Sequence, residues 1–377
     1  MKIGIVCYPT FGGSGVVATE LGMALAAQGH QVHFISYSQP FRLDEFSNNL
    51  FYHEVAISNY PLFEFLPYEI SLTSKLVDVV LHQDLDLLHV HYAIPHASAA
   101  YLAKQILATK GKKIPFITTL HGTDITLVGK DPSYKPVIEF AINQSDGVTA
   151  VSDSLRRDTF KNFNIDCEVE VIPNFIDIKN YAKPSDLCFK EMYAPNGERI
   201  LTHISNFRPV KRIEDVVRVF ERVHREIPSK LILAGDGPER GNVENLARHL
   251  GVIHDVVFLG KTKAIERVLC MSDLFLLTSE SESFGLSSLE AMASRVPVIS
   301  TNTGGIPEVN IHGFSGFLSN VGDVDDMAKN ALTLLKDDAL MEQFCKNART
   351  QAEKFNITKV LPMYEAMYSR LTGIQLP

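Results

Sequence analysis

The sequence predicts an α/β protein of two domains, each built on a parallel sheet with helices on both faces. Short apolar runs typical of buried strands alternate with helical patterns along the whole chain, as expected for repeated βαβ units. The alternation is interrupted once, at 173–198, where prolines and a glycine replace clear periodicity. The length of 377 residues suits two domains of ordinary size. We therefore expect an N-terminal domain of 1–173 plus 358–377 and a C-terminal domain of 174–357, which face each other across a cleft.

The composition is that of a globular protein with a full core. Hydrophobic residues make up 45% and charged residues 21% of the chain. The net charge of −8, without a long basic run, argues against binding to nucleic acid or to an anionic membrane surface. No apolar run approaches a membrane span, and Met1 leads directly into a strand pattern. Five scattered cysteines without C-x-x-C spacing argue against a zinc site or disulfide scaffold, so we expect a cytoplasmic protein.

The first half of the chain carries strand patterns, each followed by a helical pattern. The strands are expected at 2–8, 30–37, 85–91, 115–120, 147–152 and 168–172, and helices after the first strand and near 70–83, 96–109, 133–144 and 153–163. A glycine loop, 12–15, joins the first strand to its helix, where exposed N–H groups favour a close ligand. The loop does not spell G-x-G-x-x-G, and no acidic residue ends the next strand, so we reject a dinucleotide-dependent dehydrogenase. A tight turn without a ligand stays open as the alternative.

Polar residues gather where these strands end. Because parallel strands share a carboxyl edge, the side chains are expected in one crevice with the glycine loop. They are Tyr92, Thr118, Thr119, His121 and Asn174. A neutral His121 imidazole would hydrogen-bond a substrate hydroxyl, unless it merely caps the strand. Three further histidines, at 89, 91 and 96, have no acidic partner at ligand spacing, so no metal site is expected.

The second half repeats the alternation. Its strands are expected at 200–205, 230–236, 255–260, 274–279 and 296–301, and its helices near 213–227, 238–250, 263–271, 285–294, 323–336, 338–354 and 358–372. Further glycine turns follow strands at 235–238 and 303–305. The polar junction from 280 to 285 therefore lies at the carboxyl end of one strand and the amino end of a helix, where α/β sheets bind ligands.

Two carboxylates, Glu282 and Glu290, bracket that helix start with seven residues between them. A carboxylate beside a phosphate is better paired with hydroxyl donors, such as a sugar or a ribose diol. Cations that would neutralise a diphosphate, Arg208, Lys211 and Arg212, follow the first strand of this domain. The pattern therefore outlines a site for a nucleotide sugar, with solvated surface charges as the plain alternative.

These motifs resemble the retaining glycosyltransferases of family 4, which have the GT-B fold of two Rossmann-like parallel-sheet domains. The resemblance covers essentially the whole chain. It rests on the glycine loop, His121-Gly122-Thr123-Asp124, Pro173-Asn174, Arg208 with Lys211, Gly235-Asp236-Gly237-Pro238-Glu239 and Glu282-x7-Glu290. The stretches YPTFGGSG, LHGTDIT, SNFRPVKR and NTGGIPEV are similar to a branch that joins the N-acetylglucosamine of UDP-N-acetylglucosamine to L-malate, the first step of bacillithiol biosynthesis.

The resemblance implies a role for each matched residue. His121, Arg208, Lys211 and Glu282 would be catalytic. The donor would contact Gly13, Arg208, Lys211, Glu282, Phe284, Gly285, Leu286 and Glu290 in a C-terminal nucleotide-sugar-binding domain. Retaining members transfer on one face of the sugar, with the leaving phosphate oxygen taking the acceptor proton, so no metal or other cofactor is implied. Where many members carry the diphosphate-binding Arg, this chain has Asn206, which leaves the choice among Asn206, Arg208 and Arg212 open.

The acceptor follows less directly from the residues. An acidic acceptor needs N–H donors and hydroxyls in the N-terminal, acceptor-binding domain, and these are offered by Gly13, Ser14, Tyr92, Thr118, Thr119 and Asn174. A small polyol would be satisfied in a similar way. Three alternatives therefore stay open: a family 4 enzyme with another acceptor, a sugar-nucleotide epimerase, and a non-catalytic UDP-sugar-binding protein. The sequence does not decide whether the protein is a homo-oligomer.

Overall fold

The chain divides into two compact units. The computed structural model describes residues 1–10, 12–40, 43, 48–57, 67–127, 129, 131–181 and 189–375. Met1–Phe175 and Ile357–Pro377 form the first unit, and Ile176–Asn356 forms the second. These limits lie within two residues of those expected from the sequence, although part of the expected 173–198 linker lies outside the described residues.

The first unit is built on a parallel sheet of seven described strands in the order β3-β2-β1-β4-β5-β6-β7. The strands are β1 (Lys2–Val6), β2 (Gln31–Ser36), β3 (Leu50–Glu54), β4 (Leu87–His91), β5 (Phe116–Leu120), β6 (Gly147–Ala150) and β7 (Val169–Val171). β3 was not expected, because an edge strand is only half buried and its sequence, LFYHE, lacks an apolar run. The predicted strands are present, shorter by one or two residues.

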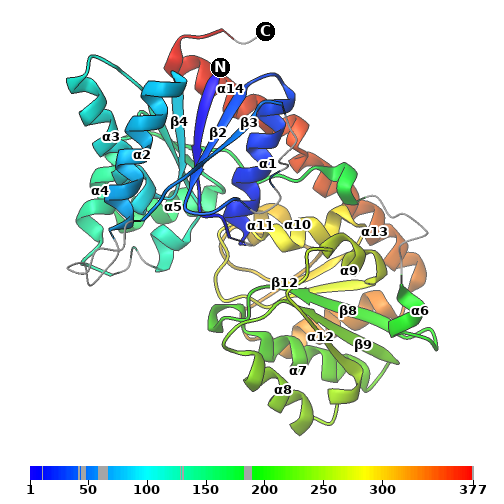
Figure 1. The fold of residues 1–377 in the computed structure, drawn as a ribbon. Helices are drawn as coiled ribbons and strands as arrows, with labels where there is room; N and C mark the ends of the chain where they lie inside the picture. Colours follow the sequence, from blue (N-terminus) through cyan, green and yellow to red (C-terminus); the bar gives the residue numbers. More distant parts are fainter. Residues whose placement is uncertain are drawn as a thin grey trace. The chain divides into compact units, whose positions relative to one another are not determined.

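Helices cover both faces of this sheet (Figure 1). They are α1 (Gly13–Ala27), α2 (Tyr68–Gln83), α3 (Ser98–Thr109), α4 (Lys135–Asn143), α5 (Asp153–Asn162) and α14 (Ile357–Thr372). α2 and α3 pack on one face around Leu88 and Val90, while α1 and α14 pack side by side on the other. α14 follows the second unit in sequence but belongs to the first, where Tyr364 and Tyr368 are completely buried.

The second unit is built on a parallel sheet of six described strands in the order β10-β9-β8-β11-β12-β13. They are β8 (Arg199–Ile204), β9 (Ser229–Ala234), β10 (Val256–Gly260), β11 (Leu274–Leu277), β12 (Val298–Thr301) and β13 (Gly316–Ser319). Its helices are α6 (Lys190–Tyr193), α7 (Ile213–His224), α8 (Arg240–His249), α9 (Ile265–Met271), α10 (Leu286–Ala293), α11 (Ile306–Val309), α12 (Val324–Leu335) and α13 (Asp338–Ala352). The unexpected β13 is again a short edge strand.

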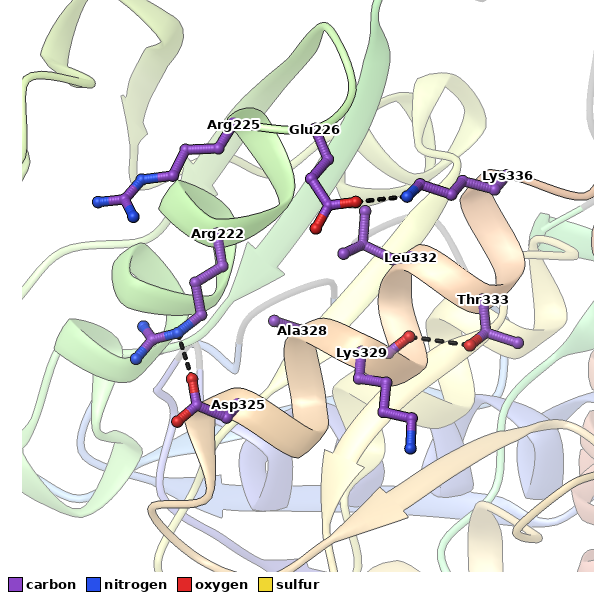
Figure 2. Close-up of a pocket in the computed structure, with 9 residues that line it drawn as sticks. All are labelled: Arg222, Arg225, Glu226, Asp325, Ala328, Lys329, Leu332, Thr333 and Lys336. Atoms are coloured by element: carbon purple, nitrogen blue, oxygen red, sulfur yellow. Dashed lines mark hydrogen bonds and ion pairs between the residues drawn. The ribbon is translucent and has the colours of Figure 1, made fainter.

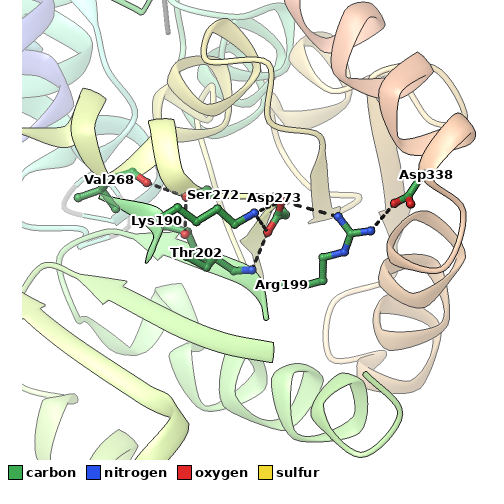
Figure 3. Close-up of polar contacts among 8 residues, drawn as sticks. Lys190, Arg199, Thr202, Val268, Ser272, Asp273 and Asp338 are labelled. Atoms are coloured by element: carbon green, nitrogen blue, oxygen red, sulfur yellow. Dashed lines mark hydrogen bonds and ion pairs between the residues drawn. The ribbon is translucent and has the colours of Figure 1, made fainter. Parts of the chain in front are cut away.

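Asp273, just before β11, fixes the start of the second sheet (Figure 3). Its carboxylate accepts hydrogen bonds from Lys190 Nζ at 2.6 and 2.7 Å and from the backbone N–H of Ile200 at 2.7 Å. One side chain therefore ties α6, β8 and β11 together at the edge where the strands begin.

Within the described part of the chain, no helix combines the length and apolar character that a membrane span requires. Cys7 and Cys167 are free thiols, and Cys270 is disulfide-bonded. Cys188 lies outside the described residues. The spacing of the cysteines did not predict the disulfide at Cys270.

Candidate active site

Each sheet contains one point where the strand order reverses direction. In the first unit it lies between β1 and β4, and in the second between β8 and β11. Loops leaving such neighbouring strands run to opposite faces of the sheet, which opens a crevice at the carboxyl edge. The loops that follow these four strands carry most of the residues singled out in the sequence. Each unit therefore has one candidate binding crevice at the carboxyl edge of its sheet, which we call its half-site.

In the first unit, the loop after β1 presents the start of α1. Gly12 precedes the helix in an extended conformation, no side chain caps it, and its first turn has no acidic residue. A Cβ on Gly15 would lie 2.5 Å from the Thr10 carbonyl oxygen, so only glycine fits there. Backbone N–H groups at Gly13 and Ser14 therefore stand at the positive end of a helix dipole, a site that favours an anion.

Tyr92, the residue after β4, joins this helix start. Its backbone has a positive φ of 84°, and its hydroxyl donates a hydrogen bond to Ser14 Oγ at 2.7 Å. Burial raises the pKa of Tyr92 to about 12, so the phenol keeps its proton. The structure thus brings Gly13, Ser14 and Tyr92 together at the switch point, as the sequence predicts.

His121 follows β5 in the same unit and is held by neighbouring groups. Its Nε2 lies 2.7 Å from Nδ1 of His91, the last residue of β4. Burial lowers the pKa of His121 to about 3, so its imidazole is neutral at physiological pH. Asp124 does not touch the ring but accepts hydrogen bonds at 3.0 Å from the backbone N–H groups of Gly122 and Ala93, and burial raises its pKa.

The two threonines expected in the acceptor site lie inside the protein. Thr118 is completely buried and its hydroxyl pairs with Ser145 Oγ at 2.7 Å. Thr119, also completely buried, holds Nε2 of His89 at 2.7 Å. The alternation of side chains along β5 places the two on opposite faces of the sheet. Their expected contact with a substrate is therefore corrected to an internal role, because neither hydroxyl is exposed.

Asn174 follows β7 in the same unit. Its side chain is 7% exposed, and its Oδ1 has no hydrogen-bond partner among the described residues. A buried amide oxygen without a partner is unusual, and a ligand hydroxyl would satisfy it.

In the second unit, the loops after β8 and β11 meet through an ion pair. Lys211 Nζ donates to Glu282 Oε1 at 2.5 Å, and Ser279 Oγ donates to the same oxygen at 2.8 Å. Both charged side chains are less than one-fifth exposed. Oε2 of Glu282 makes no hydrogen bond with a described residue and remains available to a hydroxyl donor.

The backbone around Glu282 is held by glycines. A Cβ on Gly304 would lie 1.9 Å from the Glu282 carbonyl oxygen, and Gly305 N–H donates to that oxygen at 2.9 Å. Gly285 begins α10 with a φ of 90°, which glycine adopts without strain. Phe284 is buried against Phe355, so its ring is not exposed to a ligand. No side chain caps α10 and its first turn has no acidic residue, so the N–H groups at Gly285 and Leu286 mark a positive helix end.

Of the three candidates for the diphosphate, one stands out by its surroundings. Arg208 is exposed, and its guanidinium makes no ion pair with any carboxylate in the described ranges. Arg212 instead gives its Nε to Asp215 at 2.7 Å. Asn206 is exposed and carries no charge. Arg208 is therefore the cation best placed to accompany Lys211.

Glu290, the second carboxylate of the motif, lies inside α10. Its Oε1 accepts a hydrogen bond from the hydroxyl of Tyr181 at 3.0 Å. Tyr181 comes from a 3-10 turn, Ile178–Tyr181, and is 5% exposed. The contact could not be predicted from the sequence, because Tyr181 and Glu290 lie 109 positions apart and carry no shared motif.

A separate groove of about 740 Å³ lies between α7 and α12, where Arg222, Glu226, Asp325 and Lys336 line it (Figure 2). Arg222 pairs with Asp325 and Lys336 with Glu226, so its main charges are matched. None of the predicted site residues lines it. Across the described residues, no three His, Cys, Asp or Glu side chains come together as a metal site.

Comparisons with known proteins define the class. The profile described as Glycosyltransferase Family 4 matches residues 11–180, and Glycosyl transferases group 1 matches 188–351. HepE of Anabaena, solved in complex with UDP and glucose, has a TM-score of 0.82 at 21% identity and covers 98% of this chain and 99% of its own. Sucrose-phosphate synthase from Thermosynechococcus elongatus has a TM-score of 0.80 at 19% identity, over 99% of both chains. The protein is a glycosyltransferase with the GT-B fold.

A more similar sequence defines the family. N-acetyl-alpha-D-glucosaminyl L-malate synthase of Bacillus anthracis is 48% identical over 98% of this chain and 96% of its own length. An uncharacterized glycosyltransferase of Methanocaldococcus jannaschii is 25% identical over 97% of both. The chain belongs to the family of N-acetyl-alpha-D-glucosaminyl L-malate synthases.

Proposed function

We propose that this protein transfers N-acetylglucosamine from UDP-N-acetylglucosamine to the hydroxyl of L-malate. The observation that carries the proposal is the 48% identity over nearly the whole length to the Bacillus anthracis enzyme of that name. The two half-sites supply the chemistry that such a reaction needs, one for the nucleotide sugar and one for the acceptor.

The donor belongs to the second unit. The diphosphate would meet the positive start of α10 and the cations Arg208 and Lys211, which are matched to its negative charge. Glu290, held by Tyr181, would accept hydrogen bonds from the ribose diol. Glu282 would use its open Oε2 for a sugar hydroxyl while Oε1 keeps Lys211 in position.

The reaction would retain the configuration of the sugar. The bond between the anomeric carbon and the diphosphate oxygen breaks, and the malate hydroxyl oxygen bonds to that carbon on the same face. The hydroxyl proton passes to the departing phosphate oxygen, so no protein base is required. Lys211 and Arg208 would stabilise the charge that grows on the phosphate, which is where a fixed cation accelerates the step most.

The acceptor belongs to the first unit. L-malate carries two carboxylates, and the N–H groups at Gly13 and Ser14 together with the Tyr92 hydroxyl would bind one of them. Asn174 Oδ1 would accept a hydrogen bond from a substrate hydroxyl. The buried Thr118 and Thr119 support the sheet behind these groups.

Neither a metal nor another cofactor enters the proposed reaction, because Lys211 and Arg208 supply the positive charge. We place the reaction in the cytoplasm, where UDP-sugars and malate are substrates of metabolism. Turnover should therefore continue in EDTA, and a loss of activity that a divalent ion restores would contradict this part of the proposal.

The test is a panel of small acceptors incubated with the protein and UDP-N-acetylglucosamine, with product masses and UDP release recorded. We expect UDP release to depend on L-malate and the product to carry one N-acetylglucosamine on malate. Malate alone without the donor is the blank, and D-malate and succinate are matched controls. UDP release without an acceptor would indicate an epimerase or hydrolase instead. A product with another acceptor, but none with malate, would overturn the acceptor assignment.

A further inference from the structure

Three histidine rings lie in a stack beneath the first half-site. His89 and His91 lie on the same face of β4, with ring centroids 4.6 Å apart, and His91 stacks on His121 with centroids 5.0 Å apart. His89 and His91 are completely buried, and His121 is 9% exposed. Only the outermost ring, His121, is among the expected site residues, so the two buried rings behind it need an explanation.

All three rings are neutral. Burial lowers the pKa of His89 and of His121 to about 3, and lowers that of His91 well below its usual range. A neutral imidazole has one N–H donor and one bare nitrogen that accepts, so every hydrogen bond in the stack restricts where the protons lie. His89 has both nitrogens paired, with the Tyr368 hydroxyl and Thr119 Oγ1 at 2.7 Å each.

His91 has one paired and one unpaired nitrogen. Nδ1 lies 2.7 Å from His121 Nε2, whereas the buried Nε2 has no partner among the described residues. Two proton arrangements satisfy the bond between the rings. In the first, His91 Nδ1–H donates and its buried Nε2 is a bare acceptor. In the second, His121 Nε2–H donates and His91 is left with a buried N–H that donates to nothing.

The first arrangement is favoured, because buried N–H groups without a partner are rarer and more costly than unpaired acceptors. It fixes the proton of His121 as well. If His121 Nε2 accepts from His91, then the proton of His121 is on Nδ1. That atom has no partner among the described residues, so the N–H is available to a ligand.

We propose that His91 is a positioning residue that holds His121 in the Nδ1–H tautomer, so that His121 presents a hydrogen-bond donor to the substrate. A donor of this kind binds a hydroxyl, carboxylate or phosphate oxygen. It cannot take a proton at Nδ1, so His121 is not the base of the reaction. This consequence rests on the proposed function and agrees with proton transfer to the leaving phosphate.

The first experiment needs no substrate. The full chain, labelled with ¹⁵N in its histidines only, is examined by long-range ¹H–¹⁵N correlation, and the His121 signals are assigned by their loss in His121→Asn. We expect a protonated Nδ1 and a bare Nε2 at neutral pH. A protonated Nε2, or a doubly protonated ring, would overturn the proposal. Because no acceptor is present, failure here is distinguishable from failure of the proposed function.

The second experiment removes the partner. His91→Phe keeps an aromatic ring in the stack but removes both nitrogens, so His121 should return to the tautomer that free imidazole prefers, with the proton on Nε2. We expect kcat to fall about 10-fold, which corresponds to the loss of one ordinary hydrogen bond. UDP affinity should not change, because the nucleotide belongs to the other unit.

The matched control is His33→Phe in β2. His33 is 1% exposed and, like His91, pairs through Nδ1 with another histidine, His53 at 2.9 Å, and leaves its buried Nε2 without a described partner. The substitution His33→Phe makes the same chemical change as His91→Phe, but away from His121. The His121 tautomer and kcat should therefore both stay as in the parent. If His91→Phe folds and lowers kcat while the His121 tautomer is unchanged, the positioning role is wrong.

Discussion

At the scale of single residues, the ion pair between Lys211 and Glu282 is the main evidence for how the proposed donor half-site works. Lys211 Nζ lies 2.5 Å from Glu282 Oε1, so the carboxylate would orient the lysine for the proposed diphosphate. Such preorganisation matters most where charge develops during the reaction, since the fixed cation needs no rearrangement in the transition state.

Lys211→Ala should therefore lower kcat more than it weakens binding, by about 100-fold or more. The control is Lys190→Ala, which breaks another lysine–carboxylate pair of the second unit, at Asp273, far along the sheet at its amino edge. Steady-state kinetics on both variants gives the comparison. A loss that appears wholly in KM would show that Lys211 binds the ground state and transition state alike.

Substitutions of Glu290 and Glu282 should affect the binding of different parts of the donor, the nucleotide and the sugar respectively. Glu290→Ala is expected to weaken UDP and UDP-N-acetylglucosamine by about 1.5–3 kcal/mol each, the usual cost of a hydrogen bond to a charged group. Glu282→Ala should leave UDP affinity unchanged and weaken only the sugar nucleotide. Calorimetry with both ligands measures the difference, and equal UDP affinity in the parent and a folded Glu290→Ala would remove Glu290 from the ribose site.

At the scale of elements, α14 offers a matched pair of tyrosines. The Tyr368 hydroxyl bonds to His89, whereas the Tyr364 hydroxyl lies near Thr119 and Thr149 without a hydrogen bond of good geometry. Both rings are completely buried. Tyr368→Phe should lower the free energy of unfolding by about 1–3 kcal/mol, because it leaves a buried imidazole nitrogen unpaired.

Tyr364→Phe should lower the free energy of unfolding by less than Tyr368→Phe does, because it removes no hydrogen bond of comparable geometry. Denaturant melts of both variants give the two free energies. If Tyr364→Phe proves the more destabilising of the two, the contact between α14 and β4 does not stabilise the first unit in the way described.

The sequence predicts elements best where burial is symmetrical. Central strands such as β4 and β11 are buried on both faces and read as continuous apolar runs, so their positions were expected within a few residues. The edge strands β3 and β13 have one neighbour each, carry no such run, and were missed.

The contacts between side chains within the site were harder to predict from the sequence. The residue types of the half-sites could be predicted, because they follow strand ends and glycine turns. Which side chain meets which depends on loop geometry that periodicity does not encode. The Lys211–Glu282 and Tyr181–Glu290 pairs, 71 and 109 positions apart, emerged only in three dimensions. The inward turn of Thr118 and Thr119 likewise follows from the depth of β5 in the sheet.

At the scale of the whole molecule, buried neutral histidines make stability sensitive to acid in both units. Burial lowers the pKa of His89 and His121 to about 3 in the first unit, and of His203 to about 4 in the second. Their ordinary pKa is 6.5, so between pH 6.5 and about 4 the unfolded chain binds protons that the folded chain does not. The stabilisation is therefore complete above pH 6.5 and is lost as the pH falls.

Each such group should cost about 1.4 kcal/mol per pH unit in that interval. Unfolding midpoints measured from pH 7.5 to pH 5 should fall steadily below 6.5. In His203→Gln, the unfolding midpoint of the second unit should fall less steeply with decreasing pH than it does in the parent. A midpoint independent of pH down to 5 would show that these rings are protonated in the folded state.

The return of α14 to the first unit also sets an order of events during synthesis. Domains generally begin to fold as they leave the ribosome, in the order in which they are made. The second unit, Ile176–Asn356, is a continuous stretch and can be completed without α14. Synthesis of the first unit begins earlier but is completed later. The hydrogen bond between His89 and Tyr368 can form only after nearly the whole chain has been translated. We therefore expect the proposed acceptor half-site to be completed last during synthesis, although its residues are among the first to be made.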